Sequence, residues 1–531
     1  VINAVTYSGT NDFGASVFGF FQPVALSMTP RRGPLLAERG AVSYDYGARL
    51  SGPVVRDRLW FSAAVNPRTD EVEKDIPGHG FFLDHASSVR YATKLTWRAH
   101  PSASVEMSVL GDPTVQDQVA PPQEGISVVM TPDPLLLRRD TGGSVASLRA
   151  TVTPSPKLLL QASVARQSDR FSVAGRTPQA TSLQYLDFVN GTIAGGVDPV
   201  LETRNRTSFG LRSTFLLTRH TAILGVDYED AGTGTGGYTH YIVRLDDTTW
   251  VDVKEGQAYA NFHNRSPAAY AQDTWRVTDR LALNAGLRWS GQFMSGQSGR
   301  TAQKITDEWQ PRAGFVWQPG GAGTQRVFGS YGRFYQTVPT NMAVLWFVDF
   351  VGLYSFYNSD PRTPGATPYD VIDGSYSASQ FEKQIPGLHA ENFDEFTLGY
   401  ERQLGPGAKL TVRGMRRDLR STFQFGIDLS RDNIWVLGTP GKGDFTFLPP
   451  PKREYVALEL AAEGSWRRLG YRTSYVLSRS RGNFPGLFNS DQGELGLGPG
   501  SAYGYTMPHQ AVNSFGPLPN DRTHVFKLSA S

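Results

Sequence analysis

Residues 281–290 read Leu-Ala-Leu-Asn-Ala-Gly-Leu-Arg-Trp-Ser, and apolar positions alternate with small or polar ones along this stretch. Successive side chains of a β-strand point to opposite faces, so the odd-numbered residues from Leu281 to Trp289 would share one apolar face. Asn284 and Arg288 would then lie on the opposite face. About ten residues is also the length that a tilted strand needs to cross a bilayer. The stretch therefore predicts a membrane-spanning strand with one face in lipid.

The same alternation recurs along the chain and separates charged from apolar side chains. In residues 90–100, Tyr91, Leu95 and Trp97 fall on one face, and the other face is rich in basic residues. Strands of membrane barrels alternate between lipid-facing apolar and lumen-facing polar positions. The candidate lumen-facing residues are Arg90, Lys94, Arg98, Asn284 and Arg288. The candidate lipid-facing residues are Leu95, Trp97, Leu283, Leu287 and Trp289.

The composition favours strands and turns over helices. The chain has 531 residues, among them 56 glycines and 34 prolines, and 12% of its residues are aromatic. It contains no cysteine, which excludes disulfides, thiol catalysis and zinc-thiolate sites. The 52 basic and 49 acidic residues nearly balance, so we expect no nucleic-acid partner. No run of 18 apolar residues occurs, which argues against a helical membrane protein but not against a β-barrel.

Short and long connections alternate between about 18 expected strands. The short turns are at 101, 154–156, 278–280, 405–407 and 468–470. The long loops are at 67–87, 113–142, 169–203, 230–266, 336–393, 419–454 and 481–523. In an antiparallel meander, every second connection lies at the same end. The pattern predicts an all-β, transmembrane antiparallel up-and-down barrel whose long loops are extracellular. A tandem of soluble β-domains is the alternative, although seven long loops are unusual in such domains.

Several motifs, in order along the chain, resemble the TonB-dependent receptor family, and within it the large Oar-like receptors. Residues 50–61, Leu-Ser-Gly-Pro-Val-Val-Arg-Asp-Arg-Leu-Trp-Phe, resemble the family's Gly-Gly-Pro-Ile-x-Lys-Asp-Lys-Leu-Phe-Phe hairpin. Residues 1–11 resemble the end of its plug domain, with Ala4 and Tyr7 in place of Val and Lys. The other matching segments are 270–275 with 280–289, 311–315 with 330–335, 398–402 and 520–524.

This resemblance implies an outer-membrane barrel of about 22 strands enclosing an N-terminal plug. We expect residues 1–13 to end the plug domain and residues 14–531 to form the barrel, with the C-terminal strands and the TonB box missing. It further implies a receptor without enzymatic activity or cofactor, which binds a scarce ligand at its extracellular loops. Outer-membrane lipid and TonB, which acts through the missing plug segment, would be its partners. A structural barrel that anchors surface proteins and a passive porin are the alternatives.

Three motifs suggest other chemistry, but their context does not support it. Residues 232–237 match a dinucleotide-binding glycine pattern, yet residues 238–243 continue as strand instead of opening a helix, so we expect a flexible loop. His79, Asp84 and His85 lie in an expected loop, where nothing fixes a metal-binding geometry. The acidic pairs in 246–247 and 491–494 lack EF-hand spacing. We expect no metal site.

The most apolar stretch, residues 342–354, lies in the longest expected loop, and Asp349 interrupts it. It either folds over the barrel mouth and packs on itself or offers an apolar surface to a ligand or partner protein. The candidate contact residues are Trp346, Phe347, Phe350 and Tyr354. The class of ligand stays open among siderophore, cobalamin, oligosaccharide and peptide.

Overall fold

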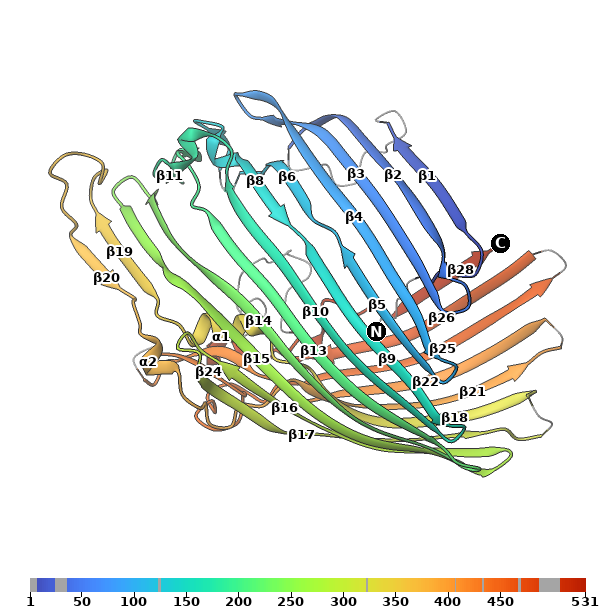
Figure 1. Ribbon diagram of the computed structural model, residues 1–531. Coiled ribbons are helices and arrows are strands. Elements are labelled where there is room, and N and C mark those ends of the chain that lie inside the picture. Colours follow the sequence, from blue (N-terminus) through green and yellow to red (C-terminus); the bar gives the residue numbers. More distant parts are fainter. Residues whose placement is uncertain are drawn as a thin grey trace.

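The computed structural model describes residues 7–23, 36–122, 126–320, 323–405, 407–431, 434–466, 469–486 and 507–531 (Figure 1). Residues 1–6, the first part of the stretch 1–13 that was expected to end the plug, lie outside them. The helices of the described part are short, and none of them is long and apolar enough to cross a membrane.

In the described part of the chain, eighteen antiparallel strands form one curved wall, in which each strand pairs with the next. They are β1 (Gly14–Gln22), β2 (Glu38–Val55), β3 (Leu59–Ile76), β4 (Gly80–His100), β5 (Ala103–Gly111), β9 (Gly143–Ser155), β10 (Leu158–Gly175), β13 (Val200–Leu216), β14 (His220–Arg244), β15 (Trp250–Thr278), β16 (Leu281–Ser295), β17 (Thr301–Trp317), β18 (Gln325–Tyr335), β21 (Asn392–Gln403), β22 (Ala408–Ser421), β25 (Arg453–Trp466), β26 (Leu469–Gly482) and β28 (His524–Ala530). The expected antiparallel up-and-down order is confirmed.

Shorter elements lie in the connections between wall strands. The strands among them are β6 (Thr114–Val119), β7 (Val128–Val129), β8 (Leu136–Thr141), β11 (Gln184–Asp187), β12 (Thr192–Ala194), β19 (Val351–Tyr357), β20 (Asp370–Asp373), β23 (Gln424–Asp428), β24 (Ile434–Gly438) and β27 (Gly516–Pro517). The helices are η2 (Asp133–Leu135), η3 (Pro178–Thr181), α1 (Thr340–Trp346), α2 (Ala378–Phe381) and η4 (Pro508–Ala511).

Two of the loop predictions, 67–87 and 230–266, are wrong, because the flanking strands continue through these stretches. β3 and β4 pair without interruption up to Ile76 and Gly80, within the expected loop 67–87. β14 and β15 pair up to Arg244 and Trp250, across most of 230–266. The glycine-rich stretch 232–237 therefore lies in β14 and is not a flexible loop. A Cβ on Gly236 would lie 2.3 Å from the Cα of Tyr259, so glycine here permits the close approach of β15.

The tight turns and the longer connections separate to opposite ends of the wall. The β4–β5, β9–β10 and β15–β16 turns gather at the lower right of Figure 1, whereas α1, β11 and the β19–β20 hairpin lie at the other end. We name these the turn end and the loop end. The short turns at 405–407 and 468–470 are only partly described.

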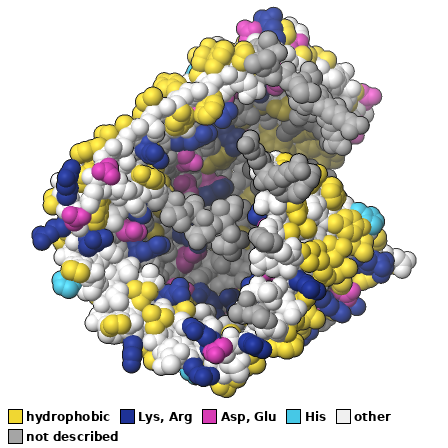
Figure 2. Space-filling model, turned by 90° about the vertical axis from the view of Figure 1, so that its right-hand side faces the viewer, with side chains coloured by type: hydrophobic (Ala, Val, Ile, Leu, Met, Phe, Trp, Pro, Cys, Tyr) yellow, Lys and Arg dark blue, Asp and Glu magenta, His cyan; other side chains and the backbone are white. Residues whose placement is uncertain are grey.

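The two faces of the wall differ in chemistry. The apolar outer face continues across neighbouring strands, as in the pairs Leu211–Val226 and Ala271–Leu287. Many of these side chains are exposed, among them Leu287, Leu95 and Trp97. Figure 2 looks into the hollow of the molecule, where Lys, Arg, Asp and Glu side chains line the wall. This is the arrangement of a barrel whose outer face contacts lipid and whose inner face contacts water.

Two buried clusters form at the loop end. The larger one joins Phe262 of β15, Met294 of β16 and Ile305 of β17 to Met342 and Phe347, from α1 and its C-terminal end. The smaller one joins Ile76, the last residue of β3, to residues of the connections that follow β5 and β10, including Val119 and Ile193. The long connections are therefore folded structures with apolar cores.

Candidate functional site

The inner wall of β14–β18 forms a cavity of about 690 Å³, which Glu395 of β21 also lines. Arg288 lines this cavity and donates from Nη1 to Asp227 Oδ2 at 2.8 Å, while its guanidinium lies 5.4 Å from the centre of the Tyr270 ring. Asn284 faces the same cavity and accepts a hydrogen bond of 2.8 Å from Thr274 Oγ1. Arg312, on the neighbouring strand, adds a second guanidinium. The cavity therefore offers charged and hydrogen-bonding groups to a polar solute or polypeptide.

Cross-strand ion pairs continue this polar lining over β21–β25. Arg417 on β22 pairs with Glu395 on β21, and Arg413 on β22 pairs with Glu459 on β25. Another pair, Arg333 on β18 with Asp394 on β21, has hydrogen bonds of 2.7 and 3.0 Å, but the register places it on the outer face, because the neighbouring Gly332 and Glu395 face the lumen. These residues were not predicted from the sequence, although their charges occupy alternate positions of predicted strands. The missing information was the register, which sets each arginine beside a carboxylate of the next strand.

A buried polar network lies between this cavity and the larger apolar cluster. Glu308 is 2% exposed and accepts a hydrogen bond of 2.6 Å from Ser290 Oγ and another from the Gln292 amide. The Gln292 carbonyl oxygen accepts from the Val338 amide nitrogen at 2.7 Å and from Asn264 Nδ2 at 2.9 Å. These bonds fix the segment before α1 to the inner wall.

The helix α1 itself lies against the inner face of the barrel. Thr340, its first residue, has its hydroxyl 2.6 Å from the hydroxyl of Thr233 on β14. Phe347 is fully buried in the cluster that contains Phe262 and Met294. The first part of the connection 336–391, up to Phe347, therefore folds inward and covers part of the mouth, one of the two outcomes that the sequence left open.

Comparison with known proteins agrees with this geometry. The family model "TonB dependent receptor-like, beta-barrel" matches residues 134–348. A curated relative, the TonB-dependent transporter Oar of Myxococcus xanthus, is 25% identical over 99% of this chain. By this model and this relative, the chain is similar to the TonB-dependent receptor family. It spans 62% of the length of the Oar relative.

Solved receptors share the fold at low sequence identity. The ferric yersiniabactin uptake receptor FyuA from Yersinia pestis has a TM-score of 0.57 at 13% identity, covering 99% of this chain and 66% of that one. The siderophore receptor PiuA from Acinetobacter baumannii has a TM-score of 0.57 at 11% identity, covering 99% of this chain and 70% of that one. These likenesses show a shared barrel fold, and the similarity to the receptor family model and to Oar indicates an outer-membrane location.

The predicted lumen-facing residues occupy two separate parts of this barrel. Asn284 and Arg288 share the cavity described above. Arg90, Lys94 and Arg98 share one face of β4, where Lys94 Nζ lies 3.4 Å from Glu106 Oε1 and the Arg98 guanidinium lies 5.2 Å from the Trp60 ring centre. Whether any of them contacts a plug or a transported solute stays a prediction.

The predicted loop-contact residues have different surroundings. Phe347 is buried, so it is not a surface contact in this structure, because it fills the apolar core of the mouth. Trp346 packs against Phe425 with ring centres 5.5 Å apart, and Phe350 stacks on Tyr376 at 5.3 Å. The sequence showed an apolar stretch but not which of its side chains turn inward.

Tyr354, the fourth contact candidate, lies on β19, which pairs with β15 at the loop end. Its hydroxyl donates to Glu255 Oε2 at 2.9 Å. Burial, together with this hydrogen bond to a carboxylate, raises the pKa of Tyr354 to about 12. At neutral pH Tyr354 is therefore a stable donor that fastens the extension of β15 to β19.

The residues that the sequence offered as possible metal ligands form hydrogen bonds and salt bridges with other residues. Asp84 binds Lys74 Nζ at 2.7 Å, His85 contacts Glu71, and His79 Nε2 lies 2.7 Å from the carbonyl oxygen of Val129. Asp246 accepts hydrogen bonds from Thr248. Across the described ranges, no group of three or more His, Asp or Glu residues could hold a metal ion. Residues 491–494 lie outside those ranges.

Proposed function

We propose that this barrel belongs to a TonB-dependent receptor that captures a scarce ligand at its loop end and imports it through the lumen. The observation that carries the proposal is the ion-paired inner wall beneath a mouth partly covered by α1 and the residues packed on it. Charges inside a membrane barrel are stable where they face water or a polar partner. Such a lumen suits a plug domain and a polar solute.

The energy for import would come from TonB, which pulls on a plug that the family carries in its barrel. The residues of this chain would supply the route: Arg288, Asp227 and Arg312 present charged groups along it. In this account the barrel catalyses no bond change. The printed names of the solved neighbours support a receptor, since they include a ferric yersiniabactin uptake receptor and a siderophore receptor.

Uptake by cells that express the full-length protein tests this proposal. Ferric siderophores, cyanocobalamin, maltooligosaccharides and oligopeptides would each be supplied in labelled form to strains with and without functional TonB. We expect one class to accumulate only when both the receptor and TonB are present, and an Arg288→Gln, Asp227→Asn double variant to slow its accumulation. Steady single-channel conductance of the full-length protein in planar bilayers without TonB would instead indicate a passive porin.

A second candidate function, a barrel that holds partner proteins at the surface, has one structural feature in its favour. Tyr369, Val371 and Ile372 are more than half exposed, the last two on the short strand β20. Such residues beside an unpaired strand edge are common at contacts with other chains. Co-purification of a partner at fixed stoichiometry, lost on Val371→Ser with Ile372→Ser, would support this role, whereas purification of the protein alone would count against it.

A further inference from the structure

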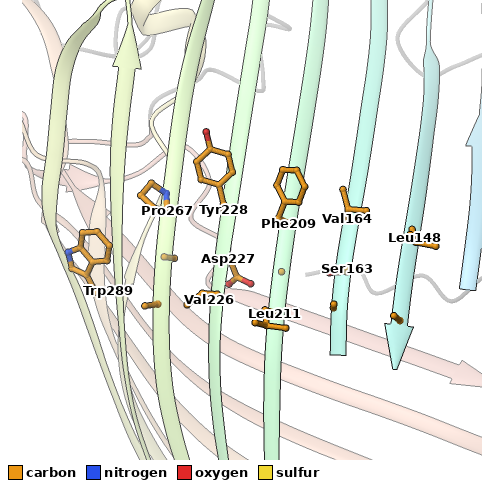
Figure 3. Close-up of a pocket in the computed structure, with 15 residues that line it drawn as sticks. Leu148, Ser163, Val164, Phe209, Leu211, Val226, Asp227, Tyr228, Pro267 and Trp289 are labelled. Atoms are coloured by element: carbon orange, nitrogen blue, oxygen red, sulfur yellow. The ribbon is translucent and has the colours of Figure 1, made fainter. Parts of the chain in front are cut away.

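The outer, lipid-facing wall contains a hollow of about 620 Å³ between β9 and β16. Small side chains form its floor: Ala150, Ala162 and Ala269. Larger ones surround them, and Figure 3 shows Leu148, Val164, Phe209 and Tyr228 on neighbouring strands at one level, with Leu211 and Val226 at the next level toward the turn end. The side chains on this face of the hollow are almost entirely apolar, so it suits a hydrocarbon chain.

The register places these residues in two rows that cross the strands. One row runs Leu148, Val164, Phe209, Tyr228 and Pro267. The row nearer the turn end runs Ala150, Ala162, Leu211, Val226, Ala269, Trp289 and Trp309. Aromatic residues gather at the boundaries of the apolar band of a membrane barrel. Phe209, Tyr228, Trp289 and Trp309 therefore indicate the boundary that lies toward the loop end.

The next row toward the loop end changes abruptly in polarity. It runs Arg166, Thr207, Asp230, Arg265, Phe293 and Lys304, again as direct cross-strand partners. We name it the cation row. It lies two residues beyond Val164 and Phe209, which is about 7 Å along a strand. Its three cations stand at the level where lipid headgroups begin.

Most of the positive charge of the cation row is not neutralised by the protein. Among the described residues, Asp230 is the one carboxylate of this row that forms salt bridges, and it is shared between Arg265, at 3.7 Å, and His263, at 2.7 Å. Arg166 is exposed and donates to the Thr207 hydroxyl at 2.8 Å instead of to a carboxylate. Arginine guanidinium groups bind phosphate through paired N–H donors.

We propose that this part of the wall is a binding site for an anionic phospholipid of the outer membrane, with an acyl chain in the hollow and its phosphate on the cation row. The apolar floor excludes a headgroup, and the cation row directly above it supplies a complementary charge. The hollow and the cation row would thus bind opposite ends of one lipid molecule, its acyl chain and its phosphate.

Native mass spectrometry of the full-length protein in a nonionic detergent tests this proposal. The protein would be mixed with equal amounts of palmitoyl-oleoyl phosphatidylglycerol and palmitoyl-oleoyl phosphatidylcholine. We expect preferential retention of phosphatidylglycerol. Arg166→Gln and Arg265→Gln should each reduce that retention about fivefold, the factor expected for one cation near anionic lipid. The matched control, Arg280→Gln in an exposed turn at the opposite end, should leave it unchanged.

A hollow-filling variant, Ala162→Phe with Ala269→Phe, should reduce retention of both lipids, because it occupies the space of the acyl chain. An excess of inorganic phosphate should not displace phosphatidylglycerol. Unchanged retention in the arginine variants, an equal loss in Arg280→Gln, or unchanged retention in the filled variant would overturn the proposal. Displacement by inorganic phosphate would show an ion site only and would also overturn it.

Discussion

Leu287 and Arg288 are neighbours in the chain, yet their side chains meet opposite surroundings. Leu287 is 46% exposed on the outer face, opposite Pro311 and Ala271. Arg288 turns inward and holds Asp227 at 2.8 Å. Alternation within a strand predicts this difference from the sequence alone. The partner of Arg288 could not be predicted in the same way, because Asp227 lies two strands away from it in the wall.

Leu287→Arg should impair folding into the membrane. A cation on the lipid face costs roughly 2–4 kcal/mol at the bilayer midplane, so we expect a loss of about 2 kcal/mol in the free energy of unfolding. The matched control is Gln272→Arg, on the lumen face of the adjacent strand beside Gly286. Urea titration in lipid vesicles would measure both variants. Equal destabilisation by the two arginines would show that the faces are assigned wrongly.

Because of Tyr354, the pairing of β15 with β19 at the loop end should become less stable at high pH. Its pKa in the folded protein, about 12, exceeds the ordinary value of 10.0. The hydrogen bond to Glu255 therefore stabilises the β15–β19 pairing fully below pH 10, and this stabilisation is lost as the pH rises from 10 to 12. Absorbance at 295 nm, compared between the wild type and Tyr354→Phe, should isolate one phenol that titrates near 12. A difference curve centred near 10 would contradict this account.

At the scale of elements, α1 is the feature that the sequence could not position. Its residues are apolar, but the groups that hold it come from distant strands: Thr233 from β14, Gln292 from β16 and Phe262 from β15. The hairpin β14–β15 was likewise expected to be a loop from residue 230 to 266, because glycines and threonines are common in loops. Pairing with a neighbouring strand along its whole length overrides that local preference.

A disulfide should lock α1 to the wall. The chain has no cysteine, and the hydroxyls of Thr233 and Thr340 lie 2.6 Å apart. Thr233→Cys with Thr340→Cys should therefore crosslink under mild oxidation, seen as a shift in gel mobility that a reductant reverses. Thr235→Cys with Thr340→Cys, displaced by two residues along β14, is the control and should crosslink far less. Equal crosslinking of both pairs would mean that α1 has no fixed place in the lumen.

At the scale of the whole molecule, the sequence predicted about 18 strands, and eighteen form the described wall. Period-two patterning and tight turns such as Thr278-Asp279-Arg280 were enough for that prediction. The structure of the mouth depends on contacts between residues far apart in the chain. Arg453 donates to Glu391 at 2.5 Å, for example, across 62 positions of sequence. Local patterns carry no information about such pairs.

The orientation of the barrel in the membrane is the central claim, because a receptor must present its loop end outside the cell. Single cysteines in this cysteine-free chain allow a direct measurement with a membrane-impermeant maleimide on intact cells. Thr363→Cys lies in an exposed turn between β19 and β20, and Asp279→Cys lies in the exposed turn between β15 and β16. The account predicts labelling of Thr363→Cys in intact cells and of Asp279→Cys only after the outer membrane is permeabilised. Labelling of Asp279→Cys in intact cells, with Thr363→Cys protected, would contradict it.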